Sequence, residues 1–215
     1  MRRFAKHEDS VTAVAVLPDG RRALSASKDR TLRVWDLDSG AELHRFAGHE
    51  GVVTAVAVLA DGRHALSASL DRTLCLWDLD GGAELRRFAK REDSVTAVAV
   101  LPDGRRALSA SQHHKLYYSL RLWDLDSGAE LHRFAGHEGE VTAVVVLAGG
   151  RRALSSSEDR TLRLWDLDGG RRLGALHLDA APACLAIGRC DQAVVGDGLV
   201  RLHWIAIQPS EPRQP

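Results

Sequence analysis

The sequence predicts an all-β fold made of repeated four-stranded units, because two motifs recur in step along the chain. A W-D-L-D motif occurs four times, with spacings of 42, 46 and 42 residues, and its tryptophans are Trp35, Trp77, Trp123 and Trp165. An R-F-A motif also occurs four times, and its phenylalanines are Phe4, Phe46, Phe88 and Phe134. No segment shows the i, i+3, i+4, i+7 apolar spacing of an amphipathic helix. A fixed period near 42 residues indicates a repeat architecture.

Each unit contains four segments with the character of strands. The first is the apolar run V-T-A-V-A-V, typical of a strand buried on both faces. Turn residues such as P-D-G follow it. The second segment, R-A-L-S-A-S, leads through a D-R-T turn to the third, L-R-V-W-D, and the fourth is A-E-L-H-R-F. Tight turns between successive strands predict one up-and-down antiparallel sheet per unit.

The repeats divide nearly the whole chain. Residues 2–85 match residues 86–173, which carry four extra residues inside the third unit. A fifth, degenerate unit keeps the apolar rhythm but lacks the W-D pair. We therefore expect one domain over 1–207, with repeats at about 1–43, 44–85, 86–131, 132–173 and 174–207. The proline-rich tail 208–215 is expected to be disordered.

Composition excludes several classes of protein. The 215 residues include 29 basic and 29 acidic side chains, and this zero net charge argues against nucleic-acid binding. No apolar run approaches the roughly 20 residues that span a bilayer, and the first ten residues lack the apolar core of a signal peptide. Three cysteines are too few for a disulfide framework, which favours a reducing compartment. We expect a cytoplasmic protein that does not bind membranes.

The motifs together resemble the WD-repeat β-propeller family, since four W-D ends lie in register with G-H-E and S-x-S-x-D-R-T. The resemblance covers about 1–207 and implies a propeller of four-stranded antiparallel blades, of which we expect five. The first residues, M-R-R-F-A, match the fourth strand of a unit rather than its first. We therefore expect this N-terminal strand to complete the last blade. The alternative is a chain that forms part of a larger propeller.

The resemblance also implies a network in each blade that joins a histidine, a serine, an aspartate and the motif tryptophan. By position, its members are His7, Ser25, Asp29 and Trp35; His49, Ser67, Asp71 and Trp77; and His137, Ser155, Asp159 and Trp165. The third unit keeps Ser109 and Trp123, but Arg91 replaces its histidine and its turn lacks the aspartate. The same residue types make up a hydrolase triad. Repetition at fold-determined positions favours a structural role, so we assign no catalytic residue.

The third unit has an irregular turn, where Ser111–Ser119 reads S-Q-H-H-K-L-Y-Y-S. The insertion gathers side chains that are common at protein interfaces, namely His113, His114, Tyr117 and Tyr118. Both a drifted hairpin in a duplicated copy and a binding loop fit this pattern. A metal site is not expected, because adjacent histidines on a strand point to opposite faces and no further ligands are visible.

Differences among the copies indicate which surface carries the function. They concentrate before the turn aspartate and three residues after the network histidine, positions that lie on the narrow face around the channel in the resembled family. With the insertion, the candidate partner-binding residues are Ser10, Lys28, Val52, Leu70, Ser94, His113, His114, Tyr117, Tyr118, Glu140 and Glu158. We expect a non-catalytic scaffold that binds a protein or peptide there and needs no cofactor.

Two other functions compete with this interpretation. The chain could be the sensor or regulatory propeller of a larger signalling protein of the nucleotide-binding or kinase type. An enzyme that uses the central channel would need a cluster of acidic, histidine or cysteine groups confined to one blade, and only the insertion offers one. Self-association is expected if the ring is incomplete.

Overall fold

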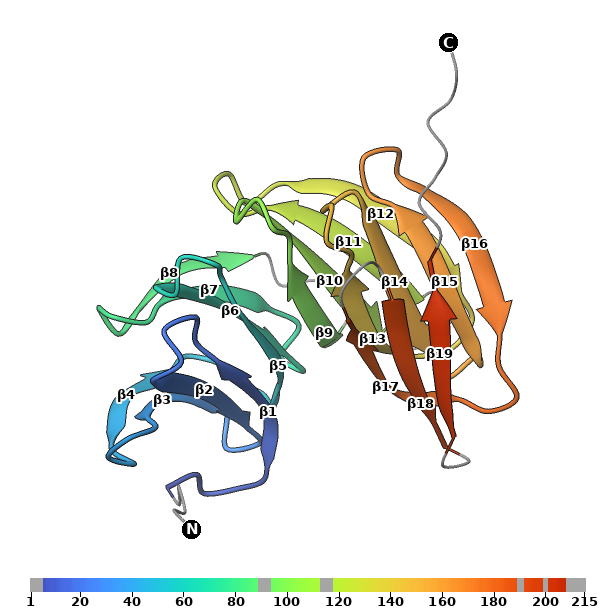
Figure 1. Cartoon of the computed structure of the whole chain (residues 1–215). Helices are drawn as coiled ribbons and strands as arrows, with labels where there is room; N and C mark the ends of the chain where they lie inside the picture. The colour runs from blue at the N-terminus through green and yellow to red at the C-terminus, as the bar shows by residue number, and fades with distance from the viewer. Residues whose placement is uncertain (1–5, 89–93, 113–117, 189–191, 199–200, 208–215) are drawn as a thin grey trace.

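The computed structural model describes residues 6–88, 94–112, 118–188, 192–198 and 201–207. These residues form nineteen strands, and no helix among them is long and apolar enough to cross a membrane. The strands make five antiparallel sheets, which we number as blades one to five in chain order (Figure 1). Within each blade, strands that follow one another in the sequence lie side by side. The predicted all-β fold of five propeller-type blades is confirmed.

The strands have the following bounds. Blade one contains β1 (Val11–Val16), β2 (Arg22–Ser27), β3 (Thr31–Asp36) and β4 (Glu42–Ala47). Blade two contains β5 (Val53–Val58), β6 (His64–Ser69), β7 (Leu74–Asp78) and β8 (Ala83–Phe88). Blade three contains β9 (Ser94–Val100), β10 (Arg106–Gln112), β11 (Tyr118–Asp124) and β12 (Glu130–His137). Blade four contains β13 (Val141–Val146), β14 (Arg152–Ser157), β15 (Thr161–Asp166) and β16 (Arg171–His177). Blade five contains β17 (Pro182–Ile187), β18 (Gln192–Asp197) and β19 (Leu202–Ala206).

The D-R-T sequence fixes the turn between the second and third strands of a blade. Arg30, Arg72 and Arg160 have φ angles of 69°, 73° and 63°, in the left-handed region that few residues other than glycine adopt. In blade one, Asp29 Oδ1 accepts hydrogen bonds from the backbone N–H of Thr31 at 3.0 Å and from its hydroxyl at 2.6 Å. These bonds stabilise the turn and hold the aspartate at the end of the blade.

Neighbouring blades pack through one repeated junction. We call the side of a blade that meets the next blade its forward face and the opposite side its rear face. At the first junction, Leu24, Leu32 and Phe46 of the forward face are buried with Ala65 and Trp77 of the rear face of blade two. The rings of Phe46 and Trp77 meet edge to face, with centroids 5.5 Å apart. The same contact recurs at 5.7 Å between Phe88 and Trp123 and at 5.6 Å between Phe134 and Trp165. Such pairs contribute about 0.5–1.5 kcal/mol beyond the burial of their surface.

The junction between blades four and five lacks this aromatic pair. By strand register, Leu176 takes the place of Phe46 and Ile205 takes the place of Trp77. Leu154 and Leu162 pack against Ala193 and Ile205 there, but the smaller side chains leave an apolar hollow of about 270 Å³. The loss of the W-D pair in the fifth repeat therefore has a direct packing consequence.

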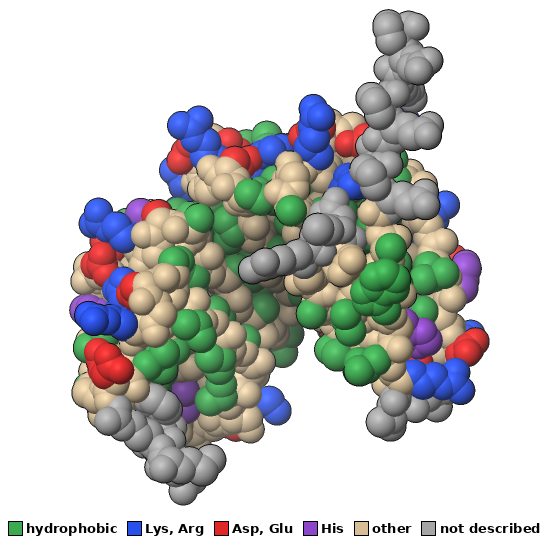
Figure 2. Space-filling view, in the orientation of Figure 1, with side chains coloured by type: hydrophobic (Ala, Val, Ile, Leu, Met, Phe, Trp, Pro, Cys, Tyr) green, Lys and Arg blue, Asp and Glu red, His purple; other side chains and the backbone are tan. Residues whose placement is uncertain are grey.

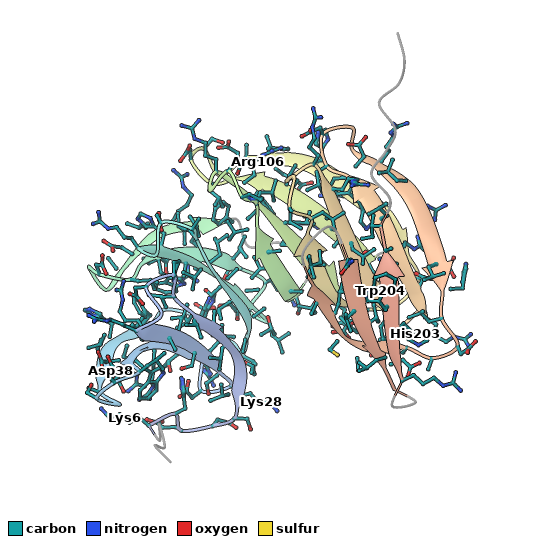
Figure 3. The ribbon with its side chains drawn as sticks, viewed as in Figure 1. Lys6, Lys28, Asp38, Arg106, His203 and Trp204 are labelled. Atoms are coloured by element: carbon teal, nitrogen blue, oxygen red, sulfur yellow. The ribbon has the colours of Figure 1, made fainter. Side chains whose placement is uncertain are left out.

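The described residues form an open arc. Figure 1 shows blades one and five on either side of a gap, with the other blades connecting them, and Figure 2 shows the same gap in the molecular surface. Lys6 lies beside blade one and Trp204 lies on blade five, across this gap (Figure 3). The expected pairing of residues 1–5 with the last blade lies outside the described residues, as does the tail 208–215.

Candidate functional site

A chain of side-chain hydrogen bonds runs through blade two. The indole Nε1 of Trp77 lies 2.7 Å from Ser67 Oγ, which lies 2.6 Å from His49 Nε2. The other ring nitrogen of His49, Nδ1, lies 2.8 Å from Asp71 Oδ2. Together these bonds connect the loop before β5 with β6, the D-R-T turn and β7.

Blades one and four contain the same arrangement. In blade one, Trp35, Ser25, His7 and Asp29 are linked by three contacts of 2.7 Å each. In blade four, Trp165, Ser155, His137 and Asp159 are linked by contacts of 2.8, 2.7 and 2.8 Å. The structure therefore brings together all twelve of these side chains, in three sets of four.

A threonine that sequence comparison did not single out also takes part. The Thr73 hydroxyl donates to Asp71 Oδ1 at 2.5 Å, and the backbone N–H of Glu50 donates to Asp71 Oδ2 at 2.9 Å. Thr31 and Thr161 donate to the aspartates of their own blades at 2.6 Å. The repeated D-R-T sequence was a signal for this contact, since the threonine recurs as regularly as the aspartate.

Burial and hydrogen bonding set the ionisation of the network. Burial lowers the pKa of His49 and of His137 below the ordinary 6.5, although the aspartate beside each ring opposes that shift. Burial alone would raise the pKa of Asp71, but hydrogen bonds from Thr73, His49 and the backbone lower it to about 2. The network thus holds a neutral imidazole beside a carboxylate.

This ionisation satisfies every donor and acceptor along the chain of bonds. With a neutral ring, Nδ1–H of His49 donates to Asp71, and Nε2 accepts from the hydroxyl of Ser67. The same hydroxyl oxygen accepts the indole N–H of Trp77. Ser67 and Ser155 are completely buried, so neither hydroxyl faces a substrate. In blades two and four the geometry is that of a structural network rather than of an exposed nucleophile with its base.

Blade three has a shorter version of the network among the residues that the structure describes. The Trp123 indole donates to Ser109 Oγ at 2.8 Å. Arg91, His113, His114 and Tyr117 lie outside the described residues. Tyr118 begins β11 and is half-buried, because it packs against the core shared by blades three and four. Its ring is therefore less available to a partner than an exposed loop position would be.

The other candidate partner-binding residues meet in pairs at one end of the blades. The backbone N–H of Lys28 donates to Ser10 O at 2.9 Å, that of Leu70 to Val52 O at 2.9 Å, and that of Glu158 to Glu140 O at 2.8 Å. Ser94 Oγ of blade three donates to Leu70 O of blade two at 3.4 Å. We call this surface the variable rim, made of Ser10, Lys28, Val52, Leu70, Ser94, Glu140 and Glu158. In Figure 3, Lys28 and Asp38 mark opposite ends of blade one.

The chemistry of the variable rim changes from blade to blade. Blade one presents the exposed cation Lys28, and blade two presents the exposed apolar side chain of Leu70. Blade four presents two carboxylates, Glu140 and Glu158. Burial raises the pKa of Glu140, and repulsion from Glu158 raises it further. A cation bound between these two carboxylates would relieve that repulsion.

Nothing among the described side chains is arranged to hold a metal ion: they contain no group of three or more histidine, cysteine, aspartate and glutamate residues suited to one. The acidic pair of the variable rim has two members.

Stacked antiparallel blades, three of which contain a tryptophan–serine–histidine–aspartate network, define a β-propeller protein. A family model described as "WD domain, G-beta repeat" matches residues 1–36, 40–78 and 128–166, more than half of the chain. The chain therefore belongs to the WD-repeat family. The third repeat falls between the matched segments, which agrees with its altered turn and its missing histidine. No curated protein matches the chain. Repeats of this family generally bind protein partners and are typically non-catalytic.

Proposed function

We propose that this chain is a non-catalytic scaffold that binds a protein or peptide partner along the variable rim, on the narrow face of the propeller. One observation carries the proposal. Among the nearly identical repeats, the residue before the turn aspartate and the third residue after the network histidine differ. In blades one, two and four, one backbone hydrogen bond joins these two residues. The cores of the same blades barely differ in sequence. Variation thus concentrates on a surface that backbone hydrogen bonds hold in place, as expected of a recognition site.

The order of side chains along the rim defines the partner's chemistry. Lys28 on blade one favours an acidic group, Leu70 on blade two favours an apolar side chain, and the carboxylates on blade four favour a basic group. Ser94 bridges blades two and three at 3.4 Å, so the rim is continuous there. The partner is therefore an extended segment that carries acidic, apolar and basic residues in spatial order.

A peptide-display selection against the purified chain tests this proposal. Selected peptides are expected to carry an acidic and a basic residue on opposite sides of an apolar one. Charge reversal by Lys28→Glu together with Glu158→Lys is expected to weaken the best peptide about tenfold or more. A peptide with its two charges exchanged should regain affinity for that variant, because complementarity is restored.

The matched control reverses charges at the other end of the blades. Asp38→Lys with Arg106→Glu changes the same number of charges away from the variable rim, and peptide affinity should stay within about twofold of the unmodified chain. Equal weakening by both pairs of substitutions would contradict the proposed site. A selection that yields peptides without a charge pattern would contradict the proposed partner chemistry.

A further inference from the structure

The two ends of the arc expose faces whose equivalents are covered by a neighbouring blade at the junctions within the chain. At each junction within the chain, the forward face of one blade covers the rear face of the next. Blade one has no preceding blade against its rear face, and blade five has no following blade against its forward face, as far as the described residues extend (Figure 1). Each free face is therefore one half of a junction.

The rear face of blade one shows what a missing neighbour leaves open. Val14 and Val16 of β1 are 63 % and 61 % exposed, whereas Val98 and Val144, the equivalents of Val14 in blades three and four, are buried. An open hollow of about 180 Å³ lies on this face, lined by His7, Val11, Val14, Ala23, Ser25, Trp35 and Leu37. In the second blade, the equivalent surface is packed against blade one.

The forward face of blade five is also apolar and open. Leu202 and Trp204 of β19 are 78 % and 64 % exposed. By strand register they are equivalent to Leu32 and Val34, which are buried against blade two. Trp204 is also the only exposed tryptophan, since the four motif tryptophans are buried. Figure 2 shows both apolar faces bordering the gap.

We propose that the forward face of blade five binds the rear face of blade one of a second copy of this chain. The contact would repeat the junction that already holds neighbouring blades together, except that blade five contributes three strands rather than four and has Trp204 in the place of Val34. Its two halves are different surfaces, so the contact joins copies head to tail. The net charge of zero adds no overall repulsion between copies. This contact is separate from the variable rim and does not depend on the function proposed for it.

The test measures the mass of the full chain by light scattering over a range of concentrations. The measured mass is expected to exceed the monomer mass of 23.4 kDa and to rise with protein concentration. Leu202→Asp with Trp204→Glu disables one half of the contact, and Val14→Asp with Val16→Glu disables the other. Each double variant should be a monomer. A mixture of the two should form a species of twice the monomer mass and nothing larger, because one intact half remains on each.

Two controls separate this contact from a general loss of solubility or fold. Leu43→Asp with Leu85→Glu places the same charges on exposed residues of β4 and β8, and it should associate like the unmodified chain. Near-ultraviolet circular dichroism should show that every variant is folded. Emission of Trp204 should shift to shorter wavelength as the unmodified chain associates. The proposal would be overturned if the unmodified chain is a monomer at all concentrations, or if the two double variants of Leu202 with Trp204 and of Val14 with Val16 associate like the unmodified chain. It would also be overturned if the mixture of these two variants forms no dimer.

Discussion

Replacing Ser67 by alanine is expected to lower the free energy of unfolding by about 2–4 kcal/mol, since a buried polar group left without a partner costs about 1–3 kcal/mol. The Ser67 hydroxyl contacts both Trp77 Nε1 at 2.7 Å and His49 Nε2 at 2.6 Å. The alanine would leave the indole N–H and the imidazole nitrogen without this partner, and both lie in the interior. Breaking such a network costs more than one hydrogen bond does.

Blade three supplies the matched control for this substitution. Ser109 occupies the same position as Ser67, but its hydrogen bond within the described residues is the one from Trp123. Ser109→Ala should therefore cost about 1–2 kcal/mol, because a single buried donor loses its partner. Urea unfolding followed by tryptophan fluorescence measures both values. Equal losses for the two variants would mean that the histidine adds nothing to the stability of blade two.

Acidification is expected to destabilise the folded chain as the pH falls through about 6.5, where a free histidine is half protonated. The folded pKa values of His49 and His137 lie below 6.5 because both rings are buried. As the pH falls, the unfolded chain takes up protons at these residues before the folded chain does. The unfolded state then binds more protons, so stability falls by up to about 1.4 kcal/mol per pH unit for each histidine.

The histidine contribution is isolated by comparing the slopes of unfolding free energy against pH above about pH 5. The stabilisation from Asp71 is lost only at lower pH, because the pKa of its carboxyl group falls from the ordinary 3.8 to about 2 in the folded chain. His49→Gln should reduce the slope of unfolding free energy against pH by up to about 1.4 kcal/mol per unit. His177→Gln, at an exposed position of β16, should leave the slope unchanged. If the slope of unfolding free energy against pH in His49→Gln equals that of the unmodified chain, the fold does not hold this imidazole neutral.

The blades and their side-chain networks were predictable from sequence because both depend on local motifs that recur. The W-D-L-D and R-F-A spacings predicted the repeats, whereas the edge-to-face contact of Phe46 with Trp77 at 5.5 Å came only from the structure. The network of each blade likewise uses residues from within 28 positions of one another, from His7 to Trp35. Short-range patterns of this kind can be recognised from the sequence alone.

The curvature of the arc was not predictable in the same way. It is the sum of small rotations at every blade junction, and no single residue encodes it. The half-buried position of Tyr118 was also missed, because a long turn looked exposed in sequence whereas β11 extends to include this residue. The D-R-T threonine was missed for a different reason. Its hydroxyl donates to the aspartate two residues before it. The expected network contained only a histidine, a serine, an aspartate and a tryptophan, so the threonine was not considered.

The central claim is that the serine, histidine and aspartate sets serve the fold while function belongs to the surface. Treating the folded chain with a fluorophosphonate and mapping adducts by mass spectrometry tests it most directly, because such reagents attach to serines activated by a neighbouring base. We expect no adduct at Ser25, Ser67 or Ser155 in the folded protein. An adduct at any of them that disappears when the histidine of the same blade is replaced would contradict the claim and identify a catalytic serine.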